Sequence, residues 1–126
     1  MKDIIIIGGG LSGLINAILL AKAGLEVLLI EKKQYPFHRV CGEYVSKEVI
    51  PFLRQHHLFP DHLQPGNISR FQLTSIKGQS TEIPLDMGAF TISRYEFDYF
   101  LYQKAVELGV VVLEKTTVTQ VNYQED

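Results

Sequence analysis

The sequence contains little cysteine and no surplus of basic residues, and both shortages limit what the protein can be. Cys41 is the single cysteine among 126 residues, so no disulfide can form within the chain, as is typical of a reducing compartment such as the cytoplasm. Twelve Lys and Arg stand against fourteen Asp and Glu, which gives a net charge of -2. Because no basic block could neutralise a run of phosphates, we expect no nucleic-acid partner.

The sequence also lacks a cluster of metal-ligating side chains and an unbroken apolar stretch of membrane length. Its four histidines are His38, His56, His57 and His62. Adjacent histidines point to different sides of a helix and no cysteine or carboxylate cluster completes a site, so we expect no metal. Residues 4–30 resemble a membrane span or a secretion signal, but three consecutive glycines interrupt them and Asp3 precedes them. We therefore expect no transmembrane segment.

What the sequence does contain is enough apolar material for a folded core. Hydrophobic residues make up 46% of the chain and charged residues 21%, without any low-complexity segment. A length of 126 residues is that of one domain. We therefore expect residues 1–126 to belong to a single domain.

Residues 3–30 follow the pattern of strand, glycine-rich turn, helix and strand. Residues 3–7 are a β-branched run bounded by glycines, which predicts a strand buried on both faces of a parallel sheet. Between Leu11 and Ala23 the apolar residues recur at helical spacing, and Gly24 stands where a C-terminal cap is expected. Residues 26–30 repeat the strand pattern. The segment therefore predicts a βαβ unit, and with it an α/β fold.

Three glycines occupy the G-x-G-x-x-G positions between the first predicted strand and helix: Gly8, Gly10 and Gly13. The first permits a tight turn, the second lets a pyrophosphate approach the backbone, and the third allows close packing of helix and strand. Glu31 comes eighteen residues after Gly13, at the end of the second predicted strand, where an acid can bind the adenosine ribose. The pattern predicts a Rossmann-like dinucleotide site, and the charge of Glu31 disfavours NADP in it.

The middle of the chain indicates an inserted helix and an antiparallel hairpin. Ser46 can cap a helix that continues to about His57. Residues 70–76 and 80–85 are extended runs joined by a short glycine-containing turn. The residues 93–96 form a capping box that opens another helix. Residues 110–113 and 116–123 each predict a further strand.

Three segments carry a resemblance to a known family. They are IIIIGGGLSGLINAILLAKAGLEVLLIEK, RVCGEYVS and SRYEFDYFLYQKAVELGVVV. Nearly the whole chain resembles the amino-terminal part of the FAD-dependent oxidoreductases that include geranylgeranyl reductases, aromatic hydroxylases and flavin-dependent halogenases. The R-x-x-F-D-x-x-L pattern ahead of A-x-x-x-G narrows the match to this group, and the sequence of residues 39–42 favours the reductase branch.

The resemblance implies roles for individual residues. Those expected at the FAD diphosphate and adenosine are Gly8, Gly10, Ser12, Gly13, Glu31, Lys32 and, through its backbone, Val118. Those expected near the flavin are Arg39, Cys41, Gly42 and Arg94. In the reductase branch the cysteine thiol contacts substrate or supplies a proton after hydride transfer, so Cys41 is the expected catalytic residue.

Three of the flavin-side assignments have an alternative. Arg39 can be a solvated loop cation, and Arg94 can be a surface residue in the first turn of a helix, although a cation is unfavourable there and indicates a nearby anion. Cys41 can be a small buried hydrophobe.

By resemblance, the function is flavin-dependent reduction of isoprenoid double bonds, with NAD(P)H as a candidate electron donor. The alternatives are an aromatic monooxygenase or halogenase, and a non-catalytic adenine-dinucleotide-binding module. Family members are several times longer and carry a later Gly-Asp segment and a sheet that covers the flavin, so the fold is incomplete relative to theirs. We therefore expect this chain alone to bind nucleotide weakly, to lack activity, and to self-associate through exposed sheet. A lipid substrate would place the enzyme at the membrane periphery, although no amphipathic basic helix indicates this.

Overall fold

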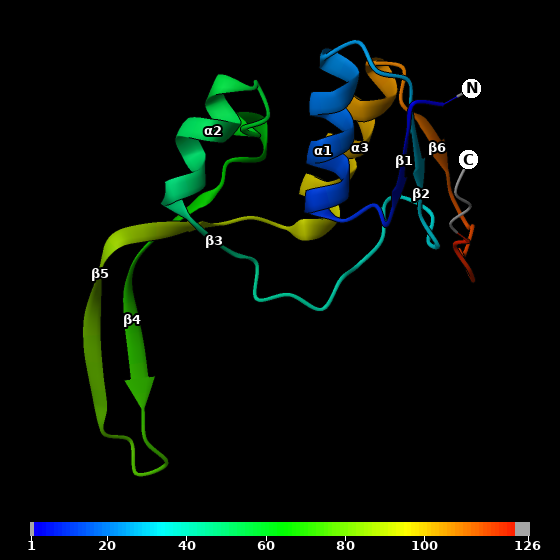
Figure 1. Ribbon diagram of the computed structural model, residues 1–126. Coiled ribbons are helices and arrows are strands. Elements are labelled where there is room, and N and C mark those ends of the chain that lie inside the picture. Colours follow the sequence, from blue (N-terminus) through cyan, green and yellow to red (C-terminus); the bar gives the residue numbers. More distant parts are fainter. Residues whose placement is uncertain (1, 123–126) are drawn as a thin grey trace. The chain divides into compact units, whose positions relative to one another are not determined.

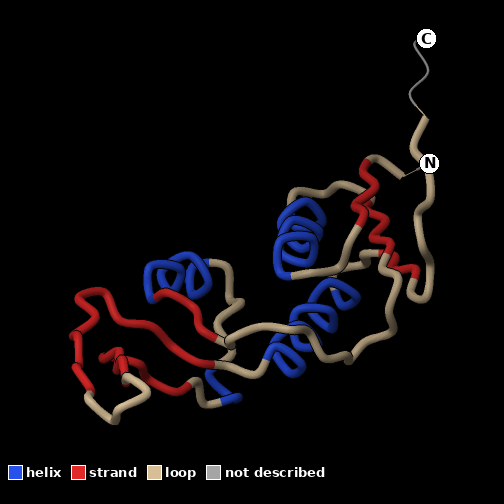
Figure 2. Tube along the Cα trace, turned by 90° about the horizontal axis from the view of Figure 1, so that it is seen from below, coloured by secondary structure: helices blue, strands red, loops and turns tan. Residues whose placement is uncertain are grey.

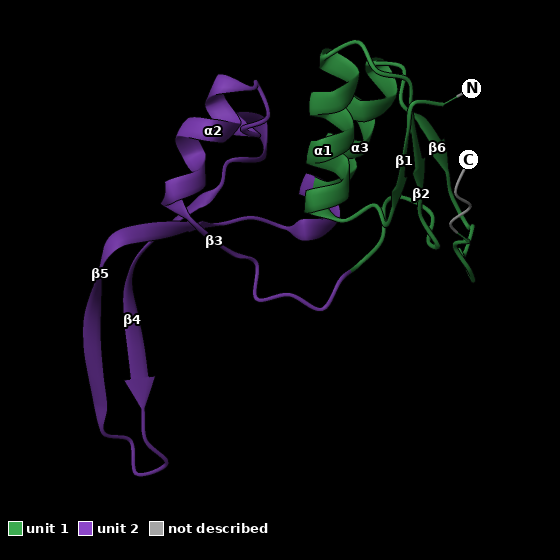
Figure 3. Cartoon of the chain, viewed as in Figure 1, with its two compact units in different colours: residues 1–38, 98–126 green, residues 39–97 purple. Residues whose placement is uncertain are grey.

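The computed structural model describes residues 2–122 and divides into two compact units (Figure 3). The first unit is formed within residues 1–38 and 98–126, and the second by residues 39–97. Helix α3 (Arg94–Glu107) begins in the second unit and ends in the first.

The first unit contains the predicted βαβ arrangement. Its elements are β1 (Ile4–Ile7), α1 (Leu11–Lys22), β2 (Val27–Ile30), most of α3, and β6 (Val111–Leu113). The three strands are parallel and lie in the order β1-β2-β6. The predicted α/β class and parallel pairing are therefore confirmed.

Both helices of this unit lie on the same side of the parallel sheet, as Figures 1 and 2 show. The core consists of apolar residues of α1, β2 and α3 that are almost fully buried: Leu14, Ala17, Ile18, Val27, Leu29, Leu101 and Ala105. Helix α1 ends where Gly24, with φ of +88°, takes the left-handed conformation that a glycine cap allows. This packing holds the β1–α1 turn in place at one end of the sheet.

The prediction that the first strand is buried on both faces is wrong for β1. Ile5 is 59% exposed and Ile7 is 55% exposed, because both point away from the helices. The register aligns them with β2 and β6 in two apolar rows, Ile5–Leu28–Val111 and Ile7–Ile30–Leu113. Among the described residues β1 is an edge strand with one covered face. Self-association through this open face stays a prediction.

The second unit contains the inserted helix and the hairpin. Its elements are β3 (Tyr44–Ser46), the 3₁₀ turn η1 (Lys47–Val49), α2 (Ile50–Gln55), the 3₁₀ turn η2 (Asp61–Leu63), β4 (Gly66–Thr74), β5 (Ser80–Thr91) and the start of α3. The strands are antiparallel in the order β3-β5-β4. The predicted hairpin is confirmed and is longer than expected, because the pairing continues past a bulge between Ile68 and Arg70.

The predicted capped helix after Ser46 is shorter and divided. The Ser46 hydroxyl accepts from the Glu48 N–H at 3.5 Å and so caps the 3₁₀ turn η1, not the α-helix itself. Pro51, in the first turn of α2, is compatible with a helix start, and α2 ends at Gln55 before His57 adopts a left-handed φ of +58°. The helix therefore begins later and ends earlier than the sequence pattern predicts.

The predicted strand over residues 116–123 is wrong where the structure describes it. Residues 116–122 are not in a strand, and Tyr123 lies outside the described residues. Lys115 has φ of +54°, and the Thr116 N–H then donates to the Glu31 carbonyl at 3.0 Å. The chain therefore turns at the end of β6, and alternating side chains alone do not make a strand without ladder hydrogen bonds.

Candidate nucleotide-binding site

The glycine loop, residues 8–10, joins β1 to α1 as the sequence predicts. Gly8 has φ of +101°, a conformation that side-chain-bearing residues rarely adopt, and its N–H donates to the Ile30 carbonyl at 2.8 Å. Gly10 is the N-cap of α1 and is extended, with φ of -80° and ψ of -175°. The loop therefore makes a tight reversal directly above the carboxyl ends of two parallel strands.

The amino terminus of α1 is suited to an anion. No side chain caps it with a hydrogen bond, and its first turn contains no acidic residue. The first N–H groups of a helix have no carbonyl partner within the helix, and the helix dipole adds positive potential at that end. Backbone donors at this end are therefore available to a phosphate, which is how such loops bind nucleotides.

Gly13 is a glycine because the loop backbone leaves no room for a side chain. A Cβ on Gly13 would collide with the Gly8 carbonyl oxygen and would lie 3.5 Å from Cγ2 of Ile6. The obstacle is mainly backbone and cannot rotate away. The predicted close approach therefore occurs, and it is between the first turn of α1 and the loop itself.

Glu31 lies directly beside the glycine loop. Its side chain is buried, with 5% of the residue exposed. Oε2 accepts from the Gly9 N–H at 2.8 Å and Oε1 accepts from the Lys33 N–H at 3.0 Å. A carboxylate can accept several hydrogen bonds at once, so these bonds are compatible with a further donor from a sugar hydroxyl. The fold thus brings the predicted acid and the predicted glycines together.

No sequence pattern assigns a role to two residues of this site, Gly9 and Tyr35. The Tyr35 hydroxyl donates to the Gly9 carbonyl, and a Cβ on Gly9 would collide with that hydroxyl. Tyr35 is 7% exposed, and its ring stacks on Tyr102 with centroids 4.5 Å apart. The only signal in the sequence is that Gly9 makes residues 8–10 a run of three glycines, although the motif requires a glycine only at the first and third of these positions.

Glu114 supports this aromatic pair. Its Oε1 accepts from the Tyr35 N–H at 2.6 Å, and its Oε2 accepts from the Tyr102 hydroxyl at 3.4 Å. Burial raises the pKa of Tyr102 above its ordinary value, and the charge of Glu114 and the hydrogen bond to it raise that pKa further. Tyr102 therefore stays protonated and continues to donate to Glu114 at neutral pH.

In the second unit the structure brings two predicted flavin-side residues together. The Cys41 sulfur accepts from the Glu43 N–H at 3.4 Å and from the Arg94 guanidinium at 3.8 Å. Cys41 is exposed, so the alternative of a small buried hydrophobe is wrong. Glu43 also accepts from the Arg94 N–H at 3.1 Å, which places a carboxylate at the start of α3.

A family model described as an FAD binding domain matches residues 1–126. The chain belongs to this family. Among its relatives, the flavin-dependent halogenase armH3 of Armillaria mellea is 33% identical over 98% of this chain and 26% of its own length. The digeranylgeranylglycerophospholipid reductase 1 of Methanococcoides burtonii is also 33% identical, over 98% of this chain and 31% of its own length.

Comparison with solved structures shows the same likeness to flavin-dependent enzymes. The crystal structure of the halogenase PltM in complex with phloroglucinol and FAD matches 99% of this chain and 30% of its own, with a TM-score of 0.78 and 25% identity. This chain of the FAD binding domain family therefore spans between about a quarter and a third of these relatives. The expected family membership and the resemblance to both halogenases and reductases are confirmed.

The remaining predicted residues of the FAD binding domain chain are exposed or half-buried. Lys32 and Ser12 are exposed, and Val118 and Arg39 are half-buried. A Cβ on Gly42 would meet nothing within 4 Å, so the unit itself does not require a glycine there. Their roles toward a cofactor stay predictions.

Neither a metal site nor a membrane span is found in residues 2–122. No group of three His, Cys, Asp or Glu side chains there could hold a metal ion. None of the helices described is both long and apolar enough to cross a membrane.

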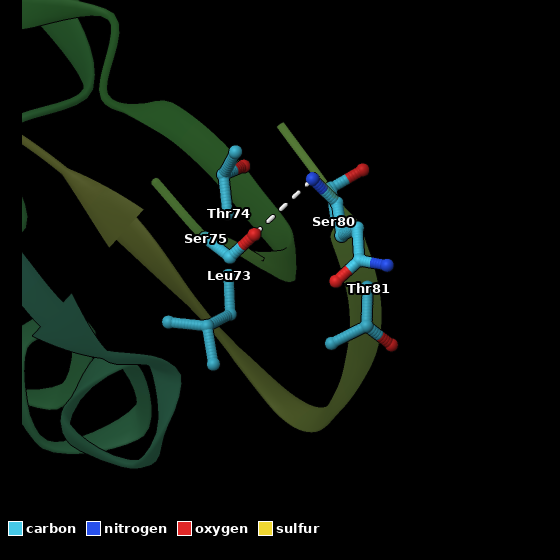
Figure 4. A pocket seen from close by; sticks show the side chains of 6 residues that line it. Leu73, Thr74, Ser75, Ser80 and Thr81 are labelled. Carbon is cyan, nitrogen blue, oxygen red and sulfur yellow. Dashed lines mark hydrogen bonds between the residues drawn. The ribbon is translucent and has the colours of Figure 1, made fainter. Parts of the chain in front are cut away.

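A cavity of about 370 Å³ lies at the tip of the β4–β5 hairpin, in the second unit (Figure 4). Six residues line it: Leu73, Thr74, Ser75, Gln79, Ser80 and Thr81. The Ser75 hydroxyl accepts from the Gln79 N–H at 3.2 Å, so this polar group belongs to the turn itself. No predicted site residue lines the cavity.

Proposed function

We propose that the first unit binds the ADP half of FAD at the glycine loop, with the diphosphate at the amino terminus of α1 and the ribose at Glu31. The observation that carries this proposal is the hydrogen bond from the Gly9 N–H to Glu31, which holds a buried carboxylate against an uncapped helix start. An acid beside a cluster of backbone donors would serve a ligand that has both hydroxyl and phosphate groups.

The chain's own residues divide this work. Gly8, Gly10 and Gly13 bring the backbone close to the diphosphate, and the exposed Ser12 is positioned in the first turn of α1. We assign Lys32 and the backbone of Val118 to the adenosine end. Glu31 repels a ribose 2′-phosphate by its charge, which favours FAD over NADP.

We assign Arg39, Cys41, Gly42 and Arg94 to the flavin end of the cofactor. The support is the contact between the Cys41 sulfur and the Arg94 guanidinium, two exposed or half-exposed groups. When bound, FAD supplies hydride transfer. The part proposed for Cys41 is to hold a proton on its sulfur and to give it to the carbon of the double bond that does not receive the hydride.

For the complete enzyme we propose reduction of isoprenoid double bonds, with NAD(P)H as electron donor. Residues 39–42, Arg-Val-Cys-Gly, favour this over halogenation, and one relative is a reductase of a geranylgeranyl-bearing phospholipid. The second candidate is a flavin-dependent halogenase, favoured by the equal identity to armH3. Product analysis separates them: saturation of a prenyl chain without halide supports the first, whereas halide-dependent modification of an aromatic substrate supports the second.

Isothermal titration of the chain with ADP and with FAD tests the binding proposal. We expect ADP to bind, because the proposed contacts of the first unit involve the ADP half, and FAD to bind at least as tightly, because it also carries the flavin end assigned above. Guanosine diphosphate serves as the control for phosphate attraction alone and should bind more weakly. Absence of ADP binding would contradict the proposal.

A further inference from the structure

We propose that Tyr35 is a positioning residue of the nucleotide site, which fixes the glycine loop in the shape that receives a diphosphate. The proposal rests on the nucleotide-binding function argued above and extends it to a residue that no sequence motif singles out. Tyr35 is 26 residues from Gly9 along the chain and reaches it only through the fold.

The buried Gly9 is held at both ends. Its N–H donates to Glu31 Oε2 at 2.8 Å, and its carbonyl accepts from the Tyr35 hydroxyl. The C=O and N–H of a trans peptide point in opposite directions. A hydrogen bond to one of these two groups therefore also fixes the direction of the other group of the same peptide unit.

The hydrogen bonds to Gly9 therefore orient one backbone group in each of the two neighbouring glycines. Holding the Gly9 carbonyl toward Tyr35 turns the Gly10 N–H away from Tyr35, at the start of α1. Holding the Gly9 N–H toward Glu31 turns the Gly8 carbonyl the other way, and that carbonyl is the atom that a Cβ on Gly13 would strike. The two bonds to Gly9 therefore set the direction of the backbone groups on both sides of it.

Tyr35 is itself held firmly enough to perform this function. Its N–H donates to Glu114 at 2.6 Å, and its ring contacts Tyr102 at 4.5 Å and Phe37 at 5.1 Å between centroids. A hydroxyl on a fixed ring holds its partner without a further loss of side-chain entropy when ligand binds. The loop is then ordered before the diphosphate arrives.

The test is Tyr35→Phe, which keeps the ring and removes the hydroxyl. Loss of one hydrogen bond to the loop should weaken ADP binding by about threefold to tenfold. The affinity of Tyr35→Phe for adenosine, measured by NMR titration, should stay within about twofold of that of the unaltered chain, since adenosine lacks the phosphates. Tyr99→Phe is the matched control: it removes a hydroxyl from the same group of aromatic rings, since Tyr99 stacks on Tyr102 at 5.9 Å between centroids.

The outcomes separate the two proposals. Unchanged ADP affinity in Tyr35→Phe, or an equal loss for ADP and adenosine, would overturn the positioning role and leave nucleotide binding standing. Failure of the unaltered chain to bind ADP would overturn both. A readout without ligand is the melting temperature of Gly9→Ala, which should recover in part in Gly9→Ala/Tyr35→Phe because the colliding hydroxyl is gone. Additive effects of the two changes would contradict the contact.

Discussion

Replacement of Gly13 by alanine is expected to cause the largest loss of both stability and nucleotide binding. The new methyl group would collide with the Gly8 carbonyl oxygen, so the loop and the first turn of α1 must move apart. Overpacking of this kind typically costs about 1–3 kcal/mol. We expect the free energy of unfolding in urea to fall by an amount in this range, and ADP affinity to fall by at least about tenfold, since the displaced backbone carries the proposed donors.

Gly42→Ala is the matched control for this change. It adds the same methyl group where no atom lies within 4 Å, and its proposed role concerns the flavin, which ADP lacks. Stability and ADP affinity should therefore stay close to those of the unaltered chain. If Gly13→Ala bound ADP as well as Gly42→Ala does, the close approach of helix and loop would have no part in binding.

Replacement of Glu31 by glutamine is expected to have the second largest effect. The two carboxylate oxygens accept from two different N–H groups, at Gly9 and Lys33, and glutamine would present an N–H₂ group to one of them. Hydrogen bonds to a charged group contribute about 1.5–3 kcal/mol, so we expect at least about a tenfold loss of ADP affinity. Glu26→Gln, which changes an exposed acid at 62% side-chain exposure, should leave the affinity unchanged.

A comparison of ADP with 2′-deoxy-ADP separates a ribose contact from a purely structural role of Glu31. The unaltered chain should prefer ADP by at least about threefold, as expected for one hydrogen bond to a charged acceptor. Glu31→Gln should lose most of that preference. An equal preference in both proteins would show that Glu31 supports the loop without touching the ribose.

The βαβ core was predictable because its signals are local. Residues 4–7 and 27–30 are apolar strands, the helix between them has regular spacing, and the glycines mark the turn. Glu31 could be placed at the loop because the ends of adjacent parallel strands meet at the same edge of a sheet. Periodicity and topology together therefore located the site.

The parts that could not be predicted depend on contacts between distant residues. Nothing in the spacing of the sequence indicates that Tyr35 reaches Gly9, or that Glu43 meets the start of α3 at Arg94. An apolar run such as 4–7 cannot show which of its faces is covered, so the exposure of Ile5 and Ile7 was missed. Alternation over 116–122 likewise could not show that the chain turns at Lys115.

The most direct measurement is a ¹⁵N–¹H NMR titration of the chain with ADP, which reports on each backbone N–H. We expect the largest shifts at residues 8–13 and at Glu31, because the diphosphate and ribose are proposed to lie against these groups. Shifts confined to the hairpin cavity at residues 73–81, with residues 8–13 unchanged, would contradict the proposed site.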